Sequence, residues 1–466
     1  MLKNNLNLLN KKKPTVAVDL LKNNLNLLNK KKPTIAVVVP SWHYWDDPSK
    51  IQPLHEMHYA TVIQNNFPGI EVKIIDLRGI SIDQQISHMH KCDIFFYWIM
   101  KAGDFTEIKG LVSEVRSTYP KSLHMAGGTH VDMTIEESSI VFDIVIKSGA
   151  ENIIKDVIER WINGVEQEKI LYGDFNEVHW GKYPFLKRDH LPETAVVNTK
   201  LFSHYGSNIR STCVLFSRGC SLKCAYCVYN VPKAIHMKSL DMIKDEILYL
   251  KNNYGVTAIN LKDEVAIPFK EKDSIPYLES IKEADIMWRG QTTVYGASTD
   301  VLKLAAESGC VELATGIESS SPLVRDIVNK KMSNDKIKRF IDDCHSFGIR
   351  VKMCLVLGLP GEQYDIADQT INFIEDMAPD YVAVSGLDPF PGSQIFNNQE
   401  YYGIKSVDHN WGNHAHLLFR FSDEEEFGVP FEYHEENQWG KTLTRKEIIE
   451  AIKKVQKYAR DQKLVY

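Results

Sequence analysis

The sequence lacks the features that mark a membrane, secreted or nucleic-acid-binding protein. Its longest apolar runs, residues 34–40 and 94–100, are far shorter than the ~20 residues of a transmembrane helix. Its N-terminus is rich in Asn and Lys and shows no apolar stretch followed by a small-residue cleavage site. Basic residues are not in excess, since 55 Lys and Arg stand against 61 Asp and Glu, a formal net charge of −6. We therefore expect a cytoplasmic protein without a membrane span and without a nucleic-acid partner.

Cysteine is scarce and unevenly spread. There are eight in 466 residues, and most are far apart, which excludes a dense disulfide framework. We interpret five of them as small apolar core residues: Cys92, Cys213, Cys310, Cys344 and Cys354. The other three, Cys220, Cys224 and Cys227, lie close together. In a reducing cytosol such a group indicates a metal site.

A direct repeat opens the chain. Residues 2–18 read LKNNLNLLNKKKPTVAV, and residues 21–37 repeat them with one difference, Ile35 in place of Val16. Two copies do not make a solenoid, so we interpret residues 1–33 as a redundant leader. The rest of the chain is predicted to divide into four parts: a Rossmann-like domain at 34–164, a linker at 165–210, a barrel at 211–404 and a C-terminal extension at 405–466.

Short apolar runs alternate with amphipathic helical patterns in both halves. In the first half, strands are predicted at 34–40, 72–76, 94–98, 122–126 and 142–147. Strands rich in Val and Ile that alternate with helices predict an α/β, Rossmann-like parallel sheet, with ligands beyond the carboxyl ends of its strands. In the second half, strands are predicted at 212–216, 258–261, 286–291, 312–317, 351–357 and 381–387. Six βα units predict a partial TIM-type barrel followed by a short C-terminal extension.

The three clustered cysteines lie in the segment FSRGCSLKCAYCVY, directly after the first predicted barrel strand. Three thiolates in one loop suit a [4Fe–4S] cluster and leave its fourth iron without a protein ligand. An open metal position allows a substrate or cofactor to coordinate. The alternative is a zinc knuckle, which needs a fourth ligand such as His236 or Cys213.

The cysteine spacing resembles that of the radical S-adenosylmethionine (SAM) superfamily. The resemblance implies that Cys220, Cys224 and Cys227 bind a [4Fe–4S] cluster whose open iron chelates SAM. It also implies reductive cleavage of SAM to a 5′-deoxyadenosyl radical, with electrons from a partner such as flavodoxin or ferredoxin. The segments GIESS at 316–320 and LGLPGE at 357–362 match motifs that follow later strands in this family. The residues that the resemblance assigns to SAM are Tyr226, Gly316, Glu318, Ser319 and Gly361.

The first half resembles the cobalamin-binding-type domain of one subgroup of this superfamily. AGGTH at 126–130 is similar to its Gly-Gly-x-His turn. IKSGAEN at 146–152 is similar to its Gly-Glu-Gly-Glu segment, in which Gly149 and Glu151 match and Ala150 differs. The resemblance implies cobalamin contacts from Gly127, Gly128, His130, Gly149 and Glu151. No Asp-x-His-x-x-Gly segment, the source of a cobalt ligand in some such domains, is present. We expect His43, in the loop after the first strand, to face solvent.

These resemblances imply a radical SAM enzyme that transfers a methyl group from cobalamin to a carbon of a small molecule or natural-product intermediate. If the cobalamin domain is degenerate and binds no cobalamin, the enzyme would instead be a radical dehydratase, oxidoreductase or cyclase acting on a small molecule. The non-enzymatic alternative is an iron–sulfur redox protein. The candidate catalytic residues at the barrel strand ends are Asp263, Glu264 and Arg289. Gln291 is a further candidate for substrate contact, and Arg289 would suit a carboxylate or phosphate.

Overall fold

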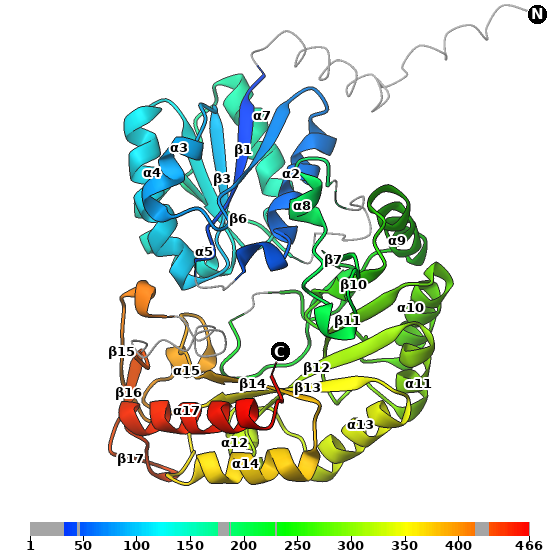
Figure 1. Ribbon diagram of the computed structural model, residues 1–466. Helices are drawn as coiled ribbons and strands as arrows, with labels where there is room; N and C mark the ends of the chain where they lie inside the picture. Colours follow the sequence, from blue (N-terminus) through cyan, green and yellow to red (C-terminus); the bar gives the residue numbers. More distant parts are fainter. Residues whose placement is uncertain are drawn as a thin grey trace, which may run out of the picture.

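The computed structural model describes residues 32–43, 47–175, 186, 188–228, 231–414 and 428–465. The predicted leader, residues 1–33, lies almost wholly outside this range. The described residues form two six-stranded parallel sheets, one from each half of the chain (Figure 1). Over the same range, no helix combines the length and the apolar character that crossing a membrane requires.

The first sheet has the strand order β2-β1-β3-β4-β5-β6. Its strands are β1 (Thr34–Val39), β2 (Glu71–Asp76), β3 (Ile94–Trp98), β4 (Leu123–Gly127), β5 (Ile144–Lys147) and β6 (Ile170–Tyr172). The long helices around it are α2 (Leu54–Asn66), α4 (Ala102–Thr118) and α7 (Glu151–Asn163), with the short α3 (Gln85–His88), α5 (Thr129–Met133) and α6 (Ile135–Val141). The order reverses between β1 and β3, and in doubly wound sheets a ligand binds beyond the strand ends at such a point.

Alternation along β1 explains why helices cover both faces of this sheet. Ile35 and Val37 pack with the apolar residues of α2 and α7, whereas Ala36 and Val38 pack with those of α4. All four side chains are fully buried. A strand that is apolar on both sides needs cover on both faces, as the Val- and Ile-rich run predicts.

The second sheet has the order β14-β13-β12-β11-β10-β7, and its two edge strands do not pair with each other, so the barrel is partial. Its strands are β7 (Ser211–Val214), β10 (Ala258–Leu261), β11 (Met287–Thr292), β12 (Cys310–Glu318), β13 (Arg350–Leu357) and β14 (Tyr381–Gly386). Its outer helices are α9 (Leu240–Tyr254), α10 (Glu271–Ala284), α11 (Thr299–Glu307), α13 (Asn334–Ser346), α14 (Ile366–Met377) and α17 (Arg445–Asp461), with the short α12 (Pro322–Ile327). The predicted fold class, a Rossmann-like sheet followed by a partial barrel, is confirmed.

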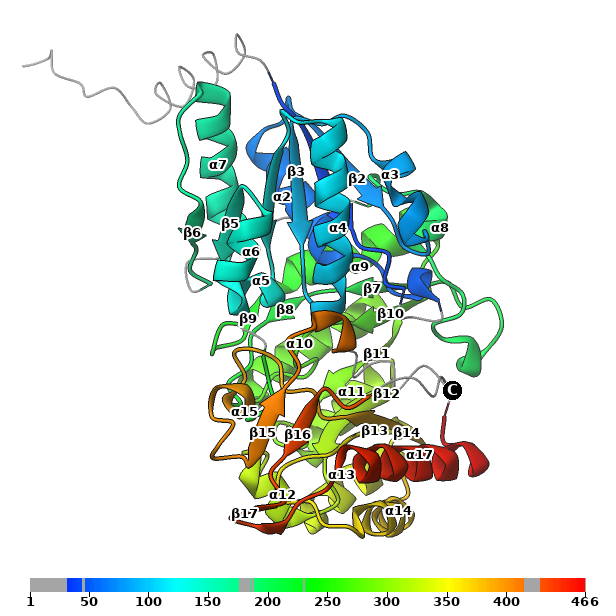
Figure 2. The same cartoon turned by 90° about the vertical axis from the view of Figure 1, so that its left-hand side faces the viewer.

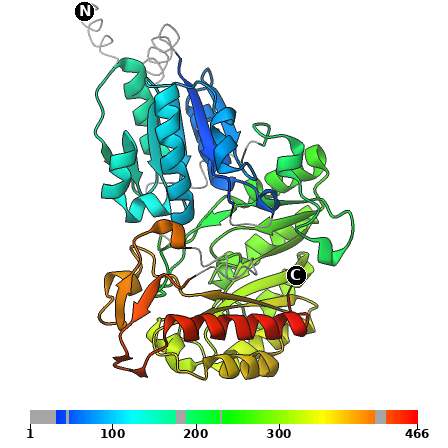
Figure 3. The same ribbon diagram turned by 60° about the vertical axis from the view of Figure 1, so that its left-hand side comes forward.

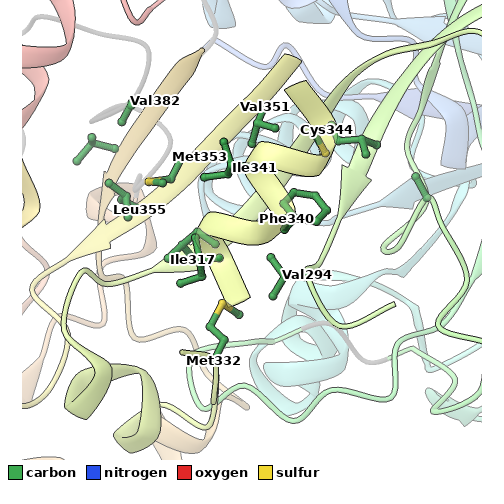
Figure 4. Close-up of a cluster of buried hydrophobic side chains, with 14 of the residues drawn as sticks. Val294, Ile317, Met332, Phe340, Ile341, Cys344, Val351, Met353, Leu355 and Val382 are labelled. Atoms are coloured by element: carbon green, nitrogen blue, oxygen red, sulfur yellow. The ribbon is translucent and has the colours of Figure 1, made fainter. Parts of the chain in front are cut away.

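The outer face of the barrel sheet is its apolar face. Val351, Met353 and Leu355 on β13 pack against Ile341 and other residues of α13 (Figure 4). The terminal helix α17 runs across the outside of β13 and β14 (Figure 3). It starts with a capping box in which Thr444 accepts from the backbone of Glu447 and the Glu447 carboxylate accepts in return, as stable helix starts do. The other face of the sheet is left for the interior of the barrel.

Short elements complete the chain between and after the sheets. The first half extends beyond the predicted boundary at 164, because β6 of the first sheet lies within the predicted linker. The rest of the linker contains α8 (Glu193–Val196) and the 3₁₀ turn η4 (Ser203–Tyr205). The other short elements of the described residues are η1 (Pro48–Lys50), η2 (Ile82–Gln84), β8 (Ser217–Arg218), β9 (His236–Met237), α15 (Gln394–Asn397), β15 (Ile404–Val407), η5 (Trp411–Asn413), β16 (Phe431–Tyr433), β17 (Glu436–Asn437) and β18 (Gly440–Lys441). The C-terminal extension reaches back to the first half, because η5 packs beneath α4 (Figure 2) and Trp411 Nε1 donates to Glu137 Oε2 at 2.8 Å.

Candidate functional site

The cysteine loop leaves the carboxyl end of β7, the first barrel strand. Cys220 is half-buried, Cys224 is buried and Cys227 is exposed, and none of the three forms a disulfide. The loop is fixed by its own backbone, since Cys220 N donates to Pro232 O at 3.0 Å and Cys227 N donates to Cys224 O at 3.1 Å. Among the residues that the structure describes, no three His, Cys, Asp or Glu side chains, the three cysteines included, converge closely enough to hold a metal ion.

Two carboxylates after β10 hold the start of this loop. Asp263 Oδ1 accepts from Phe216 N at 2.9 Å and also from Ser217 N, and Glu264 Oε2 accepts from Gly219 N at 3.0 Å. Asp263 is buried, and burial raises its pKa to about 7. From their place after a barrel strand, Asp263 and Glu264 were expected to face the substrate. The structure instead gives both carboxylates backbone partners in the loop that carries the cysteines.

Arg289 lies below the strand ends, on the side of the barrel that the linker covers. It is the third residue of β11, where its NH1 is 3.6 Å from Glu312 Oε1 and its guanidinium lies over the Phe202 ring. Glu312 Oε2 is bonded in turn by His204 and Tyr205 of η4, at 3.1 and 3.0 Å. The linker thus closes the amino-terminal end of the barrel, and Arg289 belongs to this closure. The expected position at a strand end is not where the structure places it.

The end of β12 carries a charged pair close to the cysteine loop. Lys330 Nζ lies 3.2 Å from Glu318 Oε1, and both side chains are at least nine-tenths buried. Glu318 has a φ of +70°, an uncommon conformation for a residue with a side chain. A Cβ at Gly316 would overlap the Glu318 carboxylate, so glycine leaves the room in which this pair sits. Burial, and then the charges of Glu318 and Cys224, raises the pKa of Tyr226 well above its ordinary value, which places Tyr226 beside both.

The next strand end is organised by a carboxylate that the sequence analysis did not single out. Glu362 Oε2 accepts from Gly358 N at 2.6 Å, and Glu362 Oε1 accepts from Ser319 Oγ at 3.5 Å. Burial raises the pKa of Glu362 to about 8. Gly361, just before it, has a φ of +90° and packs tightly on Ile327, so a side chain there would be strained. Ser319, Gly361 and Glu362 therefore form one hydrogen-bonded turn next to Glu318.

The carboxyl edge of the first sheet contains the remaining predicted residues. Gly128 has a φ of +110°, and a Cβ there would overlap the backbone of Ile99, while a Cβ at Gly127 would meet the Trp98 ring at 2.9 Å. Both glycines are therefore required by this tight turn. His130 is buried with its ring 4.7 Å from that of Phe105, and burial lowers its pKa to about 3.

Glu151 connects this edge to the cysteine loop. It is fully buried at the start of α7, next to the Gly149 turn, with Oε1 3.1 Å from His58 Nε2 and 3.8 Å from Arg218 NH1. Arg218 comes two residues before Cys220. Burial opposes ionisation of Glu151, but the hydrogen bond with His58 and the charge of Arg218 keep its pKa below the usual range. Neither His58 nor Arg218 was singled out from the sequence, because only the folded chain brings them to Glu151.

Several buried polar atoms at this edge have no partner within the protein. They are Trp98 Nε1, His130 Nε2 and Glu151 Oε2. Unpaired buried polar groups are rare and costly in native structures. Their concentration at the strand ends fits a polar ligand bound at this edge. By contrast His43, in the loop after β1, is half-exposed and lies 3.2 Å from Glu107 Oε2, and the hydrogen bond with Glu107 raises its pKa.

Comparison with known proteins decides what the barrel is. Residues 214–374 match the Radical SAM superfamily, a range that begins in β7 and includes the cysteine loop, Glu318 and Glu362.

The chain carries a radical SAM domain.

Enzymes of this family use a [4Fe–4S] cluster and SAM, so the protein is a radical SAM enzyme. An uncharacterized methyltransferase of Pyrococcus horikoshii is 23% identical over 372 residues, 74% of this chain and 77% of that protein. An anaerobic magnesium-protoporphyrin IX monomethyl ester cyclase of Rubrivivax gelatinosus is 24% identical over 210 residues, 44% of this chain and 38% of the cyclase.

A solved structure shares the whole two-part arrangement. It is the radical SAM methyltransferase TsrM from Kitasatospora setae, with cobalamin and a [4Fe–4S] cluster bound. The TM-score is 0.62 at 13% identity, and the alignment covers 85% of this chain and 87% of TsrM. At this identity the similarity establishes the fold, in which a Rossmann-like sheet precedes the radical SAM barrel.

Proposed function

We propose that this radical SAM enzyme binds cobalamin at the carboxyl edge of its first sheet and transfers a methyl group to a carbon of a small molecule. The observation that carries the proposal is the contact between Glu151 and Arg218, which joins that edge to the cysteine loop. The strands of the first sheet end facing the barrel (Figure 1), so ligands at the two edges would face each other. The unpaired atoms at the first edge support a polar cofactor there.

In this proposal the barrel residues have four roles. Cys220, Cys224 and Cys227 bind the iron–sulfur cluster, and Tyr226 packs on SAM. Gly316 gives SAM access to Glu318, whose carboxylate is held by Lys330 so that it can accept from ribose or amino groups. Ser319, Gly361 and Glu362 form the turn against which SAM lies. When bound, the cluster and SAM supply the 5′-deoxyadenosyl radical, and cobalamin supplies the methyl group.

The residues that the sequence analysis regarded as catalytic receive positioning roles. Asp263 and Glu264 hold the backbone of residues 216–219 and so set the position of Cys220. Arg289 and Glu312 fasten η4 into the amino-terminal end of the barrel and exclude water from that side. At the other edge, Gly127, Gly128 and Gly149 bring backbone close to the cofactor, and Glu151 orients Arg218. His130 lines the same edge.

A small reducing protein such as flavodoxin or ferredoxin, or another one-electron donor, is required to start each turnover. Cys227 is the exposed cysteine of the three, so an electron would enter from its side of the loop.

The test is an anaerobic reconstitution with iron, sulfide and hydroxocobalamin. After gel filtration, the visible spectrum should show both iron–sulfur and corrin bands, and addition of SAM and dithionite should give 5′-deoxyadenosine. A methyl transfer also gives S-adenosylhomocysteine, because a second SAM remethylates the cofactor. 5′-Deoxyadenosine without corrin retention would instead favour a radical oxidoreductase, dehydratase or cyclase, and an iron–sulfur spectrum without any SAM cleavage would favour a redox protein.

A further inference from the structure

One buried arginine holds both ends of the segment that follows β12. Arg325, on α12, is fully buried, and its guanidinium donates to oxygens at the beginning and at the end of residues 319–334. The acceptors are Ser319 O at 2.7 Å, Ser320 O at 3.1 Å, Met332 O at 3.0 Å and the side-chain oxygen of Asn334. Because the two ends are far apart in the sequence, the guanidinium closes residues 319–334, called here the closed segment.

The closure depends on the shape of the guanidinium. Nη1 of Arg325 donates to the first end, whereas Nε and Nη2 donate to the second, so one planar group spans both. Burial lowers the pKa of Arg325 to about 10, which leaves the group charged at neutral pH. A lysine in its place would keep the positive charge but would lose the planar arrangement of donors.

The middle of the closed segment is bonded to the cysteine loop. Val328 O accepts from Ala225 N at 2.9 Å, and Asn329 Nδ2 donates to Lys223 O at 2.7 Å. Lys223 and Ala225 are the two sequence neighbours of Cys224. The backbone on both sides of this buried cysteine is therefore fixed by residues from a distant part of the chain.

The closed segment also brings Lys330 back to Glu318. Lys330 N donates to Arg325 O at 2.7 Å, and Lys330 Nζ lies 3.2 Å from Glu318 Oε1. Glu318 directly precedes Ser319, the first residue that Arg325 holds. Support at this point is needed, because a φ of +70° is uncommon for a residue with a side chain. One guanidinium thus connects the backbone beside Cys224 with the Glu318 carboxylate.

We propose that Arg325 is a positioning residue of the radical SAM site, which holds Cys224 and Glu318 in a fixed relation through the closed segment. This inference rests on the proposed function, which assigns the iron–sulfur cluster to the cysteine loop and SAM to Glu318. Arg325 acts through the backbone of the closed segment. The alternative is a residue that only stabilises the core, since its guanidinium also lies over the Phe373 ring of α14 at 5.7 Å.

The first test is hydrogen exchange of the full chain, measured without iron and without SAM. In Arg325→Lys, peptides that cover residues 219–228 and 319–334 should exchange about tenfold faster than in the wild type, because bonds to a charged group are lost. Arg289→Lys is the matched control. Arg289 is also a buried arginine of the barrel, but its guanidinium contacts Asn260 and Glu312, so exchange in both segments should stay at the wild-type rate.

A second variant tests the bond to the cysteine loop without a change in the core. Asn329 is exposed and has a φ of +58°, which glycine adopts without strain. Asn329→Gly removes the bond to Lys223 O, so exchange in 219–228 should rise severalfold while the urea midpoint stays close to that of the wild type. An unchanged exchange rate in this variant would show that the closed segment does not fix the loop, which contradicts the inference.

The last test measures how much SAM the reconstituted and reduced protein needs. SAM should change the electron paramagnetic resonance signal of the cluster in the wild type and in Arg325→Lys, but half of the change should need about tenfold more SAM in the variant. The inference requires both effects of Arg325→Lys. Wild-type exchange in 219–228, or a wild-type SAM requirement, overturns it, even if the urea midpoint falls. A wild-type protein that binds no cluster or does not respond to SAM contradicts the proposed function instead, and the exchange rates still test the role of Arg325.

Discussion

The two carboxyl edges that face each other in this protein satisfy their polar groups in different ways. At the barrel edge most functional side chains bind one another or the nearby backbone: Glu318 with Lys330, Glu362 with Gly358, and Glu264 with Gly219. At the edge of the first sheet, buried atoms of Trp98, His130 and Glu151 have no protein partner. The barrel edge is therefore the more fully paired of the two, although Asp263 Oδ2 and Thr293 Oγ1 have no partner there, and we expect the first edge to depend more on a ligand to complete it.

This difference suggests that the two sites depend on their cofactors to different degrees. A preorganised site can hold its cofactor without large rearrangement and keeps its reacting groups in place. A site with unpaired buried groups loses stability when empty, and ligand binding recovers that loss. Variants at the barrel edge should therefore impair catalysis directly, and variants at the first edge should mainly alter cobalamin affinity.

The largest effect is expected from Cys224→Ala. Removal of one thiolate leaves an iron of the cluster without its protein ligand, so iron content should fall sharply and 5′-deoxyadenosine formation should be abolished. Cobalamin retention should stay close to that of the wild type, because Cys224 belongs to the barrel edge alone. Cys344→Ala, at a buried cysteine of α13, is the control and should keep the cluster. Full 5′-deoxyadenosine formation by Cys224→Ala would contradict the assignment of the site.

The next effect is expected from Asp263→Ala. The amides of Phe216 and Ser217 would lose their acceptor, at about 1–3 kcal/mol of stability for each buried group. The cysteine loop should loosen, so iron content after reconstitution should fall severalfold as measured by iron and sulfide analysis. Asp263→Asn keeps an acceptor oxygen and should retain most of the cluster. If both variants load iron as well as the wild type, Asp263 does not position the loop.

The strands of both sheets could be predicted from the sequence because buried parallel strands are nearly continuous apolar runs. The prediction for 94–98 agrees with β3, and that for 258–261 agrees with β10. The pairs β15–β16 and β17–β18 were missed, since they are short, partly exposed and antiparallel. Their pairing depends on tertiary contacts rather than on a local pattern.

The candidate site was predictable where a motif is local. The cysteine loop, Gly316 and Glu318 lie in short segments, and the structure brings them to one edge. Lys330 and Glu362 act through partners that only folding brings close, so no spacing identifies them. Arg289 shows a different limit, because a residue early in a strand lies at the amino-terminal end of a parallel barrel, away from the ligand side. The boundary of β11 was needed to place it.

A pH dependence of stability is expected from the first half. Glu56, buried on α2, has its pKa raised to about 8 by burial, with a further contribution from Asp104. A raised carboxyl pKa favours the protonated folded state, so its stabilising effect is complete below the ordinary value of 4.5 and is lost as pH rises toward 8. Between pH 5 and pH 8, the unfolding free energy of Glu56→Gln, measured by urea titration, should fall by about 3 kcal/mol less than that of the wild type.

Glu107→Gln is the control for this pH effect. Although burial opposes ionisation of Glu107, its hydrogen bonds with His43 and Ser41 lower its pKa, so it stays ionised between pH 5 and 8. The part of the wild-type fall that Glu56 causes should therefore persist in Glu107→Gln, whereas the part from His43, whose pKa Glu107 raises, should be lost. A wild-type slope that Glu56→Gln leaves unchanged would show that another group is responsible.

The smallest effect, and the sharpest test of the contrast, is expected from Tyr59→Phe. The buried Tyr59 hydroxyl meets only the backbone of Ala150, in a weak contact, so its removal should change the unfolding free energy of the empty protein by less than about 1 kcal/mol. Its removal should weaken cobalamin binding severalfold if the ligand supplies a stronger partner for this hydroxyl. Tyr97→Phe is the matched control, because the equally buried Tyr97 hydroxyl lies 3.1 Å from His124 Nδ1. That variant should lose about 1 kcal/mol of stability with no change in cobalamin affinity. If the two variants behave alike, the Tyr59 hydroxyl does not contact a ligand at the first edge.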